Sequence, residues 1–397
     1  MKIIKKIIVA IIALIIALFT AFMVLPLDNF IAEKAAISKG YVISESYKDI
    51  EDRYYYNRLS KLEKEAYRIV YASIYDFPEK VVVPSLSDDE FKKVFCALSY
   101  DNPDLFFLDN KFTLTSLGSV NYFIPHYALT KEDYENKIQF VNTEAEKIII
   151  EANKFTTEYD KELYVHDYLA SVCQYANNTD KMACTIYGLL IDGHANCEGY
   201  SRTAQFIFNK LGIKNHLVTG MAFNEQGVNE GHMWNVVKID GKSYNLDITW
   251  DDYSFDEKVN NPDNSPSHIY FNISTKDLSV THEADSDDLW AECTAESYGY
   301  FRNKGLLFSK VGIGMENAIR REVIEVFKKG NRSIEIAFTD IDIFNEGFNF
   351  LASSNGKMYN IILSANEQVP TAKIDPEQIQ YSKNEDNLII RFFFVEK

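Results

Sequence analysis

The sequence predicts a mixed α+β protein with several domains, and two kinds of hydrophobic spacing support this prediction. Between residues 59 and 172, apolar residues recur every three or four positions, as on one face of a helix. Between Val218 and Asp252 the spacing shifts toward every second position, which is typical of strands. The 397 residues also exceed a single typical core. We therefore expect helical segments first, then strands near the middle, with further folded units around them.

Composition and charge indicate a globular protein and argue against one class of binding partner. The chain is 46% hydrophobic and 14% aromatic, which is the composition of a globular protein. It has 58 acidic and 41 basic side chains, a net charge of -17, and so would repel phosphate backbones. We therefore expect no nucleic-acid partner.

The N-terminus has the features of a membrane anchor. Lys2, Lys5 and Lys6 precede an uncharged apolar run over residues 7–25, close to the roughly 20 residues that a helix needs to cross a bilayer. A cleaved signal peptide is the alternative, but its apolar part usually has only about 7–15 residues and a small-x-small cleavage site follows. We expect an uncleaved transmembrane anchor over residues 1–27. The positive-inside rule then places the lysines in the cytoplasm and the rest of this single-pass chain outside the cell membrane.

Helical patterns predict an accessory helical or α+β domain over residues 45–155. Apolar residues from Leu59 to Ile74 have helical spacing. The sequence from Ser87 to Glu90 forms a capping box for a second helix, and Thr130-x-x-Asp133 opens a long third one. A further helix from about Glu158 to Val172 starts the next domain.

The C-terminal part predicts a small α+β domain over residues 295–397. A helical pattern ends at Gly330, a natural helix C-cap. A very apolar strand over residues 388–395 ends the chain. An alternating strand precedes it and contains Ile334, Ile336 and Phe338.

Cys197 is the first candidate for chemistry. Apolar residues between Tyr200 and Leu211 share one face of a helix that Gly212 would cap, so Cys197 lies at its N-terminus. The dipole there favours an anion and hence the reactive thiolate. A buried structural thiol is the alternative, because free cysteine is among the most buried residue types. The chain has five cysteines, an odd number; Cys173 and Cys184 are the nearest pair, and their connectivity stays open.

A hairpin brings a histidine and an aspartate together. Asp240-Gly241 between two alternating runs predicts a two-residue loop. With this loop, His232 and Asp247 are diagonal neighbours on one face, within about 7 Å. The opposite face is the one that we expect to be buried, which leaves the face of His232 for a site. The expected open face also carries Trp234, Val236 and Asn245, and the expected buried face carries Met233, Val237, Ile239, Tyr244, Leu246 and Ile248.

These three residue types suit acyl transfer. A carboxylate can orient the imidazole, and the imidazole can activate the thiol for attack through a thioester. Zinc ligation by His194, Cys197, His216 and His232 is the alternative. No second close pair of ligands completes such a site. We expect no metal and no cofactor.

Several motifs in this order resemble the transglutaminase-like superfamily. They are His166-Asp167-Tyr168-Leu169, Asn196-Cys197-Glu198-Gly199-Tyr200-Ser201, Gly212-Ile213, His232-x-Trp234-Asn235 and Tyr244-x-x-Asp247-x-Thr249-Trp250-Asp251. The resemblance covers about residues 156–290 and places the domain at 156–294. It implies a papain-like α+β fold, in which the cysteine helix packs on an antiparallel sheet. It also implies Cys197 as nucleophile, His232 as base and acid, and Asp247 as the orienting carboxylate.

The flanking segments, including Asn102-Pro103-Asp104-Leu105-Phe106-Phe107, resemble membrane-anchored bacterial members of this superfamily. The resemblance implies an extracytoplasmic thiol enzyme, with peptidase-like or amidase-like hydrolysis of a surface protein or cell-wall peptide favoured. Crosslinking by glutamine transamidation and a non-catalytic binding or scaffold module are the alternatives. The backbone N–H of Cys197 is one expected oxyanion donor. Tyr175, Tyr200 and Trp234 are the candidate substrate-binding residues. No counterpart of the calcium-binding segments of the animal crosslinking enzymes is visible in the sequence.

Overall fold

The computed structural model describes residues 31, 34–35, 50, 52–117, 120–176, 180–223, 229–252, 265–296, 299–353 and 356–397. The chain divides into two compact units, Met1–Gln139 and Phe140–Lys397. No helix in the described ranges is long and apolar enough to cross a membrane. Residues 7–25, on which the predicted anchor rests, lie outside those ranges. The fold is mixed α+β, as predicted. The domain boundaries at residues 155 and 294 stay predictions.

The first unit combines helices with a small antiparallel sheet. Its helices are α3 (Tyr54–Asn57), α4 (Lys61–Ile74) and α5 (Asp88–Asp101), and its strands are β1 (Val81–Pro84), β2 (Leu108–Leu117) and β3 (Val120–Tyr127). The strands run in the order β1-β3-β2. The capping box predicted at Ser87 and Glu90 is confirmed. The long helix predicted after Thr130 is α6 (Lys131–Ala152), which continues past the boundary between the units.

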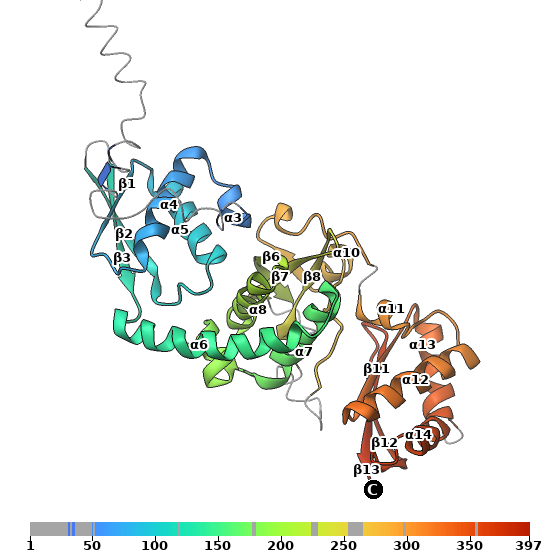
Figure 1. Ribbon diagram of the computed structural model, residues 1–397. Helices are drawn as coiled ribbons and strands as arrows, with labels where there is room; N and C mark the ends of the chain where they lie inside the picture. Colours follow the sequence, from blue (N-terminus) through green and yellow to red (C-terminus); the bar gives the residue numbers. More distant parts are fainter. Residues whose placement is uncertain are drawn as a thin grey trace, which may run out of the picture. The chain divides into compact units, whose positions relative to one another are not determined.

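The central part of the second unit carries the predicted cysteine, histidine and aspartate. After α7 (Glu158–Val172), the chain forms β4 (Gln174–Tyr175), a short π-helix (Gly188–Asp192), β5 (His194–Ala195) and α8 (Cys197–Leu211). An antiparallel sheet follows, in the order β8-β7-β6-β9, from β6 (Lys214–Phe223), β7 (Asn229–Ile239), β8 (Lys242–Leu246) and β9 (His282–Ala284). Helix α8 packs against β6 and β7, and α7 packs against α8 (Figure 1).

Short helices complete this part: α9 (Ile248–Asp251), α10 (Thr275–Leu278) and a 3₁₀ turn (Asp287–Leu289). The strand pattern predicted up to Asp252 is wrong at its end. β8 stops at Leu246, and Asp247 caps α9 instead. The β-branched Ile248 and Thr249 favoured strand in the sequence pattern, but the carboxylate of Asp247 accepts the first backbone N–H groups of a helix.

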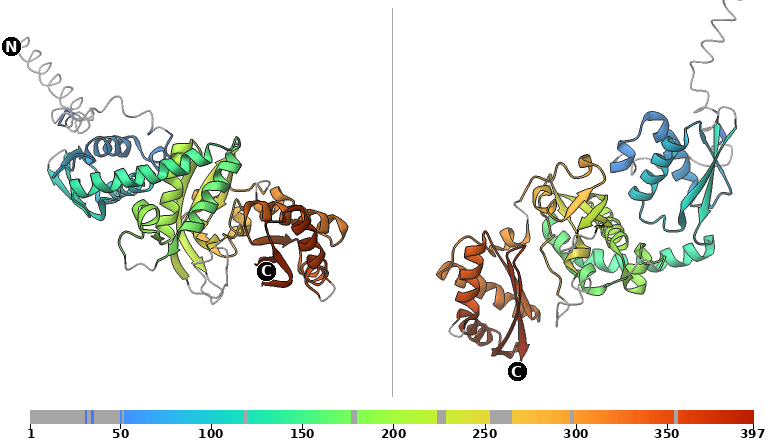
Figure 2. Two further views of the ribbon diagram at one scale, coloured as in Figure 1. Left: turned by 60° about the horizontal axis from the view of Figure 1, so that its bottom comes forward. Right: turned by 180° about the vertical axis from the view of Figure 1, so that it is seen from behind.

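The last part of the second unit is a sheet in the order β10-β11-β13-β12, with helices on one of its faces (Figure 2). The strands are β10 (Leu307–Phe308), β11 (Ser333–Phe338), β12 (Ile374–Asn384) and β13 (Ile389–Glu396). The helices are α11 (Tyr300–Lys304), α12 (Ile313–Lys329), α13 (Ile341–Ala352) and α14 (Lys357–Gln368). The predicted alternation in β11 is confirmed, because Ile334, Ile336 and Phe338 face the apolar core.

Candidate active site

Cys197 is the first residue of α8, as the sequence predicted. Asn196 is the N-cap, and its side-chain Oδ1 accepts a hydrogen bond from the N–H of Gly199 at 3.1 Å. The Cys197 side chain is half-buried. As the first helical residue it has no carbonyl within the helix for its own N–H. A half-buried thiol at this position lies where helix N–H groups and the dipole favour an anion.

The start of α8 is fixed by close backbone packing. A Cβ on Gly199 would lie 2.2 Å from the carbonyl oxygen of Ala183, so only glycine fits there. The Ser201 hydroxyl lies 2.8 Å from the carbonyl oxygen of Cys197 and 2.9 Å from that of Met233. These contacts connect the first turn of α8 to the strand that carries the histidine.

The predicted hairpin is confirmed. Ile239 pairs with Lys242, and the loop residues Asp240 and Gly241 have φ angles of 47° and 81°. Positive φ at both loop residues is the requirement of a type I′ turn, and glycine and aspartate tolerate it. The turn sets the register of β7 against β8. The last paired residue before Asp247 is Leu246, opposite Asn235.

His232 and Asp247 are in direct contact. His232 Nε2 lies 2.7 Å from Asp247 Oδ2, and both side chains are buried. The other carboxylate oxygen, Oδ1, accepts the N–H groups of Thr249 at 3.0 Å and Trp250 at 3.3 Å. The aspartate thus caps α9 with one oxygen and holds the imidazole with the other.

The charges in the site favour a protonated imidazole. Burial lowers the pKa of His232, but the charge and hydrogen bond of Asp247, then those of Cys197, outweigh burial and raise this pKa to about 10. Since Nε2 faces Asp247, Nδ1 is the nitrogen that is left to face Cys197. Burial alone would raise the pKa of Asp247, but His232 and then His282 hold it below its usual range. The arrangement therefore suits an imidazolium next to an ionised carboxylate.

His282 is a second histidine on the same carboxylate, and the sequence reading gave it no role. Its Nε2 lies 3.1 Å from Asp247 Oδ2, and its Nδ1 lies 2.8 Å from the Thr281 hydroxyl. Burial lowers the pKa of His282. A neutral His282 would donate from Nε2 and accept at Nδ1. Because β9 pairs with β6 across a long gap in the sequence, no local signal pointed to this contact.

Tyr175 lies close to the predicted nucleophile. It pairs with Ala195 on the neighbouring short strand, and its side chain is half-buried. Burial raises the pKa of Tyr175 to about 12, with further contributions from Cys197, Glu230 and Asp247. The phenol therefore keeps its proton at neutral pH and can donate it to a nearby anion.

Trp234 and Tyr200 are fully buried. The Trp234 Nε1 donates to Asn245 Oδ1 at 3.1 Å, and its ring stacks near His232 with centroids 6.1 Å apart. The Tyr200 hydroxyl donates to the carboxylate of Asp252. Neither side chain is exposed to solvent, and a contact of either with substrate stays a prediction.

The prediction of an open sheet face around His232 is wrong. Val236 and Asn245 on this face are buried. The segment after residue 272 covers them: Trp290 lies 5.5 Å from Trp234 between ring centroids, and Asn245 Nδ2 donates to Thr275 Oγ1 at 3.1 Å. Both faces of the sheet are therefore packed in this region.

The structure shows the state of the other cysteines and the partners of the histidines considered as zinc ligands. All five cysteines are free, including Cys173 and Cys184. His194 Nδ1 bonds to the carbonyl of Asp192, and His216 Nε2 bonds to that of Leu289. Neither of these histidines joins a group of possible metal ligands in the described part of the chain. Those groups are His166, Asp167 and His268, and His232, Asp247 and His282.

Comparison with known proteins finds one family model that matches part of the chain. Residues 149–248, which include Cys197, His232 and Asp247, match the family model described as "Transglutaminase-like superfamily". Over these residues the chain is therefore similar to the transglutaminase-like superfamily. A comparison with curated proteins found no match.

Three solved structures are similar to parts of the chain. One described as "a TGase" is 19% identical with a TM-score of 0.26, over 43% of this chain and 50% of that chain. "A Putative Cysteine Protease from Cytophaga hutchinsonii" is 13% identical with a TM-score of 0.24, over 35% and 61%. "A Putative Protease from Parabacteroides distasonis" is 11% identical with a TM-score of 0.21, over 34% and 35%. The chain spans about half the length of the first of these.

Proposed function

We propose that the chain is a thiol enzyme that cleaves amide or peptide bonds through a thioester on Cys197. One observation carries the proposal. His232 contacts Asp247 through Nε2 at 2.7 Å, while Cys197 contributes to the raised pKa of the same imidazole. A thiol, an imidazole and a carboxylate in this sequence of contacts are the parts of an acyl-transfer triad.

The steps follow from these contacts. His232 takes the thiol proton on Nδ1, and the Cys197 sulfur attacks the carbonyl carbon of an amide. The carbonyl oxygen becomes an oxyanion, and we assign the N–H of Cys197 and the hydroxyl of Tyr175 as its hydrogen-bond donors. His232 returns its proton to the leaving amine as the C–N bond breaks, and a thioester remains. Water, deprotonated by His232, then attacks the thioester and releases the acid and the thiolate.

We further propose that the enzyme acts outside the cell on a protein or peptide, such as a surface protein or cell-wall peptide. The apolar run over residues 7–25 with lysines before it supports an anchored, extracytoplasmic domain. The net charge of -17 also disfavours an acidic polymer as substrate.

The fate of the thioester separates hydrolysis from transamidation. The full-length chain is incubated with a glutamine peptide and a labelled primary amine, and ammonia and label incorporation are both measured. We expect ammonia without incorporation, and the Cys197→Ala variant should release none. Incorporation of label would favour a crosslinking enzyme instead.

A second experiment distinguishes an enzyme from a non-catalytic module. A library of peptides and wall fragments is offered to the wild-type chain, and the trapped thioester on Cys197 is sought by mass spectrometry after acid quenching. We expect an acyl adduct on Cys197 that the His232→Ala variant lacks. If no library member acylates Cys197 but some still bind, a binding or scaffold module is the better account.

A further inference from the structure

A second group of histidines and carboxylates lies away from Cys197, on α7 and on the segment before α10. His166 and Asp167 are neighbours on α7. His268 lies in the segment between residue 265 and the start of α10. His166 Nδ1 lies 3.0 Å from Asp167 Oδ1, and His268 Nε2 lies 3.0 Å from the same oxygen. Nothing in the proposed acyl transfer uses these three side chains.

The three atoms have nearly the spacing of metal ligands. Their ligand atoms all lie within 4.8 Å of one another. Zinc binds nitrogen and carboxylate oxygen at about 2.0–2.2 Å, which puts tetrahedral ligands about 3.3 Å apart. The two imidazole nitrogens point to one place, which Asp167 Oδ1 occupies. Asp167 has a 44% exposed side chain, whereas His166 is fully buried, so the carboxylate is the group that can move aside for an ion.

The second nitrogen of each histidine is also held as in metal sites. His166 Nε2 lies 3.1 Å from Asp251 Oδ2, and His268 Nδ1 lies 3.3 Å from Glu335 Oε2. Histidines that bind metals almost always donate their other ring N–H to a carboxylate, carbonyl or water, which fixes the ring and its tautomer. Both imidazoles here have such a carboxylate.

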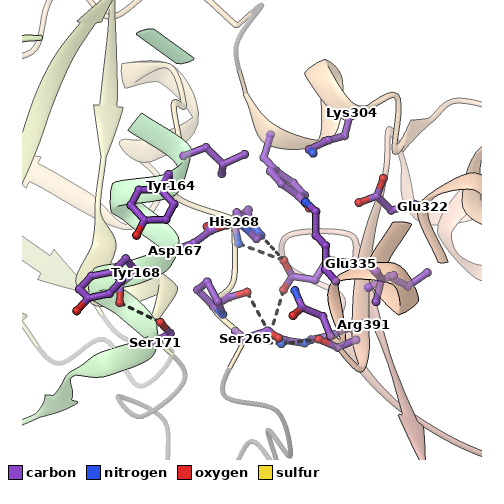
Figure 3. Close-up of a pocket in the computed structure, with 18 residues that line it drawn as sticks. Tyr164, Asp167, Tyr168, Ser171, Ser265, His268, Lys304, Glu322, Glu335 and Arg391 are labelled. Carbon is purple, nitrogen blue, oxygen red and sulfur yellow. Dashed lines mark hydrogen bonds and ion pairs between the residues drawn. The ribbon is translucent and has the colours of Figure 1, made fainter. Parts of the chain in front are cut away.

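A pocket adjoins this group. Asp167 and His268 line a cavity of about 360 Å³, and Glu335 and Arg391 line it as well (Figure 3). Catalytic zinc sites have three protein ligands and an open position for water or a small molecule. A metal held by His166, Asp167 and His268 would have its open position toward this pocket.

The group around Asp247 is the weaker candidate for a metal. Asp247 Oδ1 is engaged in capping α9, and His232 is engaged with Cys197. An ion there would displace the triad, whereas an ion at His166 leaves the triad intact. Three carboxylates, those of Asp167, Asp251 and Glu335, surround the two imidazoles of the α7 group. Glu335 contacts both His268, at 3.3 Å, and Arg391, at 3.7 Å.

We propose that His166, Asp167 and His268 bind a divalent transition-metal ion of the zinc class, with its open coordination position facing the pocket. This departs from the expectation of no metal, which rested on histidines next to Cys197. The proposal does not depend on the activity of Cys197.

Metal titration tests this assignment. The full-length chain, purified in mild detergent without a polyhistidine tag and stripped with EDTA, is titrated with ZnCl₂ by calorimetry. We expect a single tight site in the wild type and in His232→Ala and His126→Ala, and at least a tenfold weaker one in His268→Ala. Absence of tight binding in the wild type would overturn the proposal. So would loss of the site in His232→Ala but not in His268→Ala.

A milder variant guards against misfolding. Asp167→Asn has nearly the same shape and can still hydrogen-bond to one imidazole, but it loses the carboxylate ligand. We expect Zn²⁺ to raise the Tm of the wild type and to have little effect on that of Asp167→Asn, since only a ligand that binds the folded state stabilises it. An equal rise of Tm in both proteins would place the ion elsewhere and contradict the proposal.

Discussion

At the scale of single residues, the two oxygens of Asp247 have different tasks. Oδ2 contacts His232 at 2.7 Å and His282 at 3.1 Å, while Oδ1 caps α9. Substitution by asparagine separates the tasks, because asparagine is also a good N-cap. The substitution therefore removes the negative charge of residue 247, while an oxygen acceptor remains for the first N–H groups of α9.

We predict that Asp247→Asn lowers the pKa of His232 from about 10 toward its ordinary value of 6.5, because the carboxylate is the main cause of the raised value. Thioester formation should fall by about 10²–10⁴-fold, as when an orienting carboxylate is removed from other triads. NMR titration of the His232 imidazole measures the pKa. Asp285→Asn, on an exposed aspartate, is the control. An unchanged His232 titration in Asp247→Asn would contradict this account of the charges.

Glu162 is a buried acid that should make stability depend on pH. Burial raises its pKa to about 8, although a hydrogen bond from Asn272 Nδ2 at 2.7 Å opposes this. Among the described residues, Oε1 of Glu162 and Oδ1 of Asn272 are buried without a hydrogen-bond partner. A proton on Glu162 supplies the donor that both oxygens lack, as in an acid-amide pair.

The sign of the pH effect follows from the raised pKa. Between about pH 4.5 and 8 the unfolded chain loses this proton while the folded chain keeps it, so the free energy of unfolding falls as pH rises through this range. Glu162→Gln keeps the donor at every pH. We therefore expect the difference in stability between Glu162→Gln and wild type to grow from pH 5 to pH 8, by urea unfolding, and to stay constant for the exposed Glu367→Gln. A constant difference for Glu162→Gln would mean an ordinary pKa.

At the scale of elements, the position of α8 depends on one glycine. Gly199→Ala places a Cβ 2.2 Å from the backbone oxygen of Ala183, and backbone cannot easily move away. We expect a loss of about 1–3 kcal/mol or more in the free energy of unfolding, and slower alkylation of Cys197 because its helix start shifts.

Gly314→Ala is the matched control for this prediction. Gly314 is also near the start of a helix, but nothing lies within 4 Å of the Cβ that the substitution adds. Alanine should stabilise α12 by up to about 1 kcal/mol. Urea unfolding measures the free energy of unfolding of both variants. Equal changes for the two substitutions would show that the contact with Ala183 has no effect on stability.

Local signals in the sequence predicted the elements that carry the triad. Asp240-Gly241 set the hairpin register, Gly212 ended α8, and the bounds of α7 matched the pattern from Glu158 to Val172. The contact of His282 with Asp247 was not predictable in this way, since it depends on pairing of β9 with β6. The cover over Trp234 and the small sheet of the first unit also depend on contacts between segments that are distant in the sequence.

At the scale of the whole second unit, buried charges connect the segment before α10 to the C-terminal sheet. Arg391 on β13 is buried and donates to the carbonyl of Ser265 at 2.7 Å and to the Ser333 hydroxyl at 2.9 Å. It lies 3.7 Å from Glu335, which contacts His268. The alternation in β11 predicted the apolar side of this sheet, but nothing in the sequence predicted these polar contacts on its other side.

We predict that Arg391→Met destabilises the protein by about 3–5 kcal/mol, because it removes the arginine from the buried carboxylate of Glu335 and leaves that carboxylate with its contacts to His268. The matched control is Arg332→Met, which breaks an ion pair with the 62% exposed Glu396 and should cost about 1 kcal/mol or less. Urea unfolding of the full-length chain compares them. Similar losses for the two variants would argue against a buried ionic connection.

The central claim is that His232 activates the thiol of Cys197, and alkylation tests it most directly. Burial raises the pKa of Cys173 and Cys293 to about 12 and that of Cys184 to about 11, so these thiols should react slowly near neutral pH. Iodoacetamide labelling is followed residue by residue with mass spectrometry in the wild type, His232→Ala and His194→Ala. We predict rapid, selective labelling of Cys197 that slows at least tenfold in His232→Ala and is unchanged in His194→Ala. Equal labelling rates of Cys197 in the wild type and His232→Ala would contradict the claim.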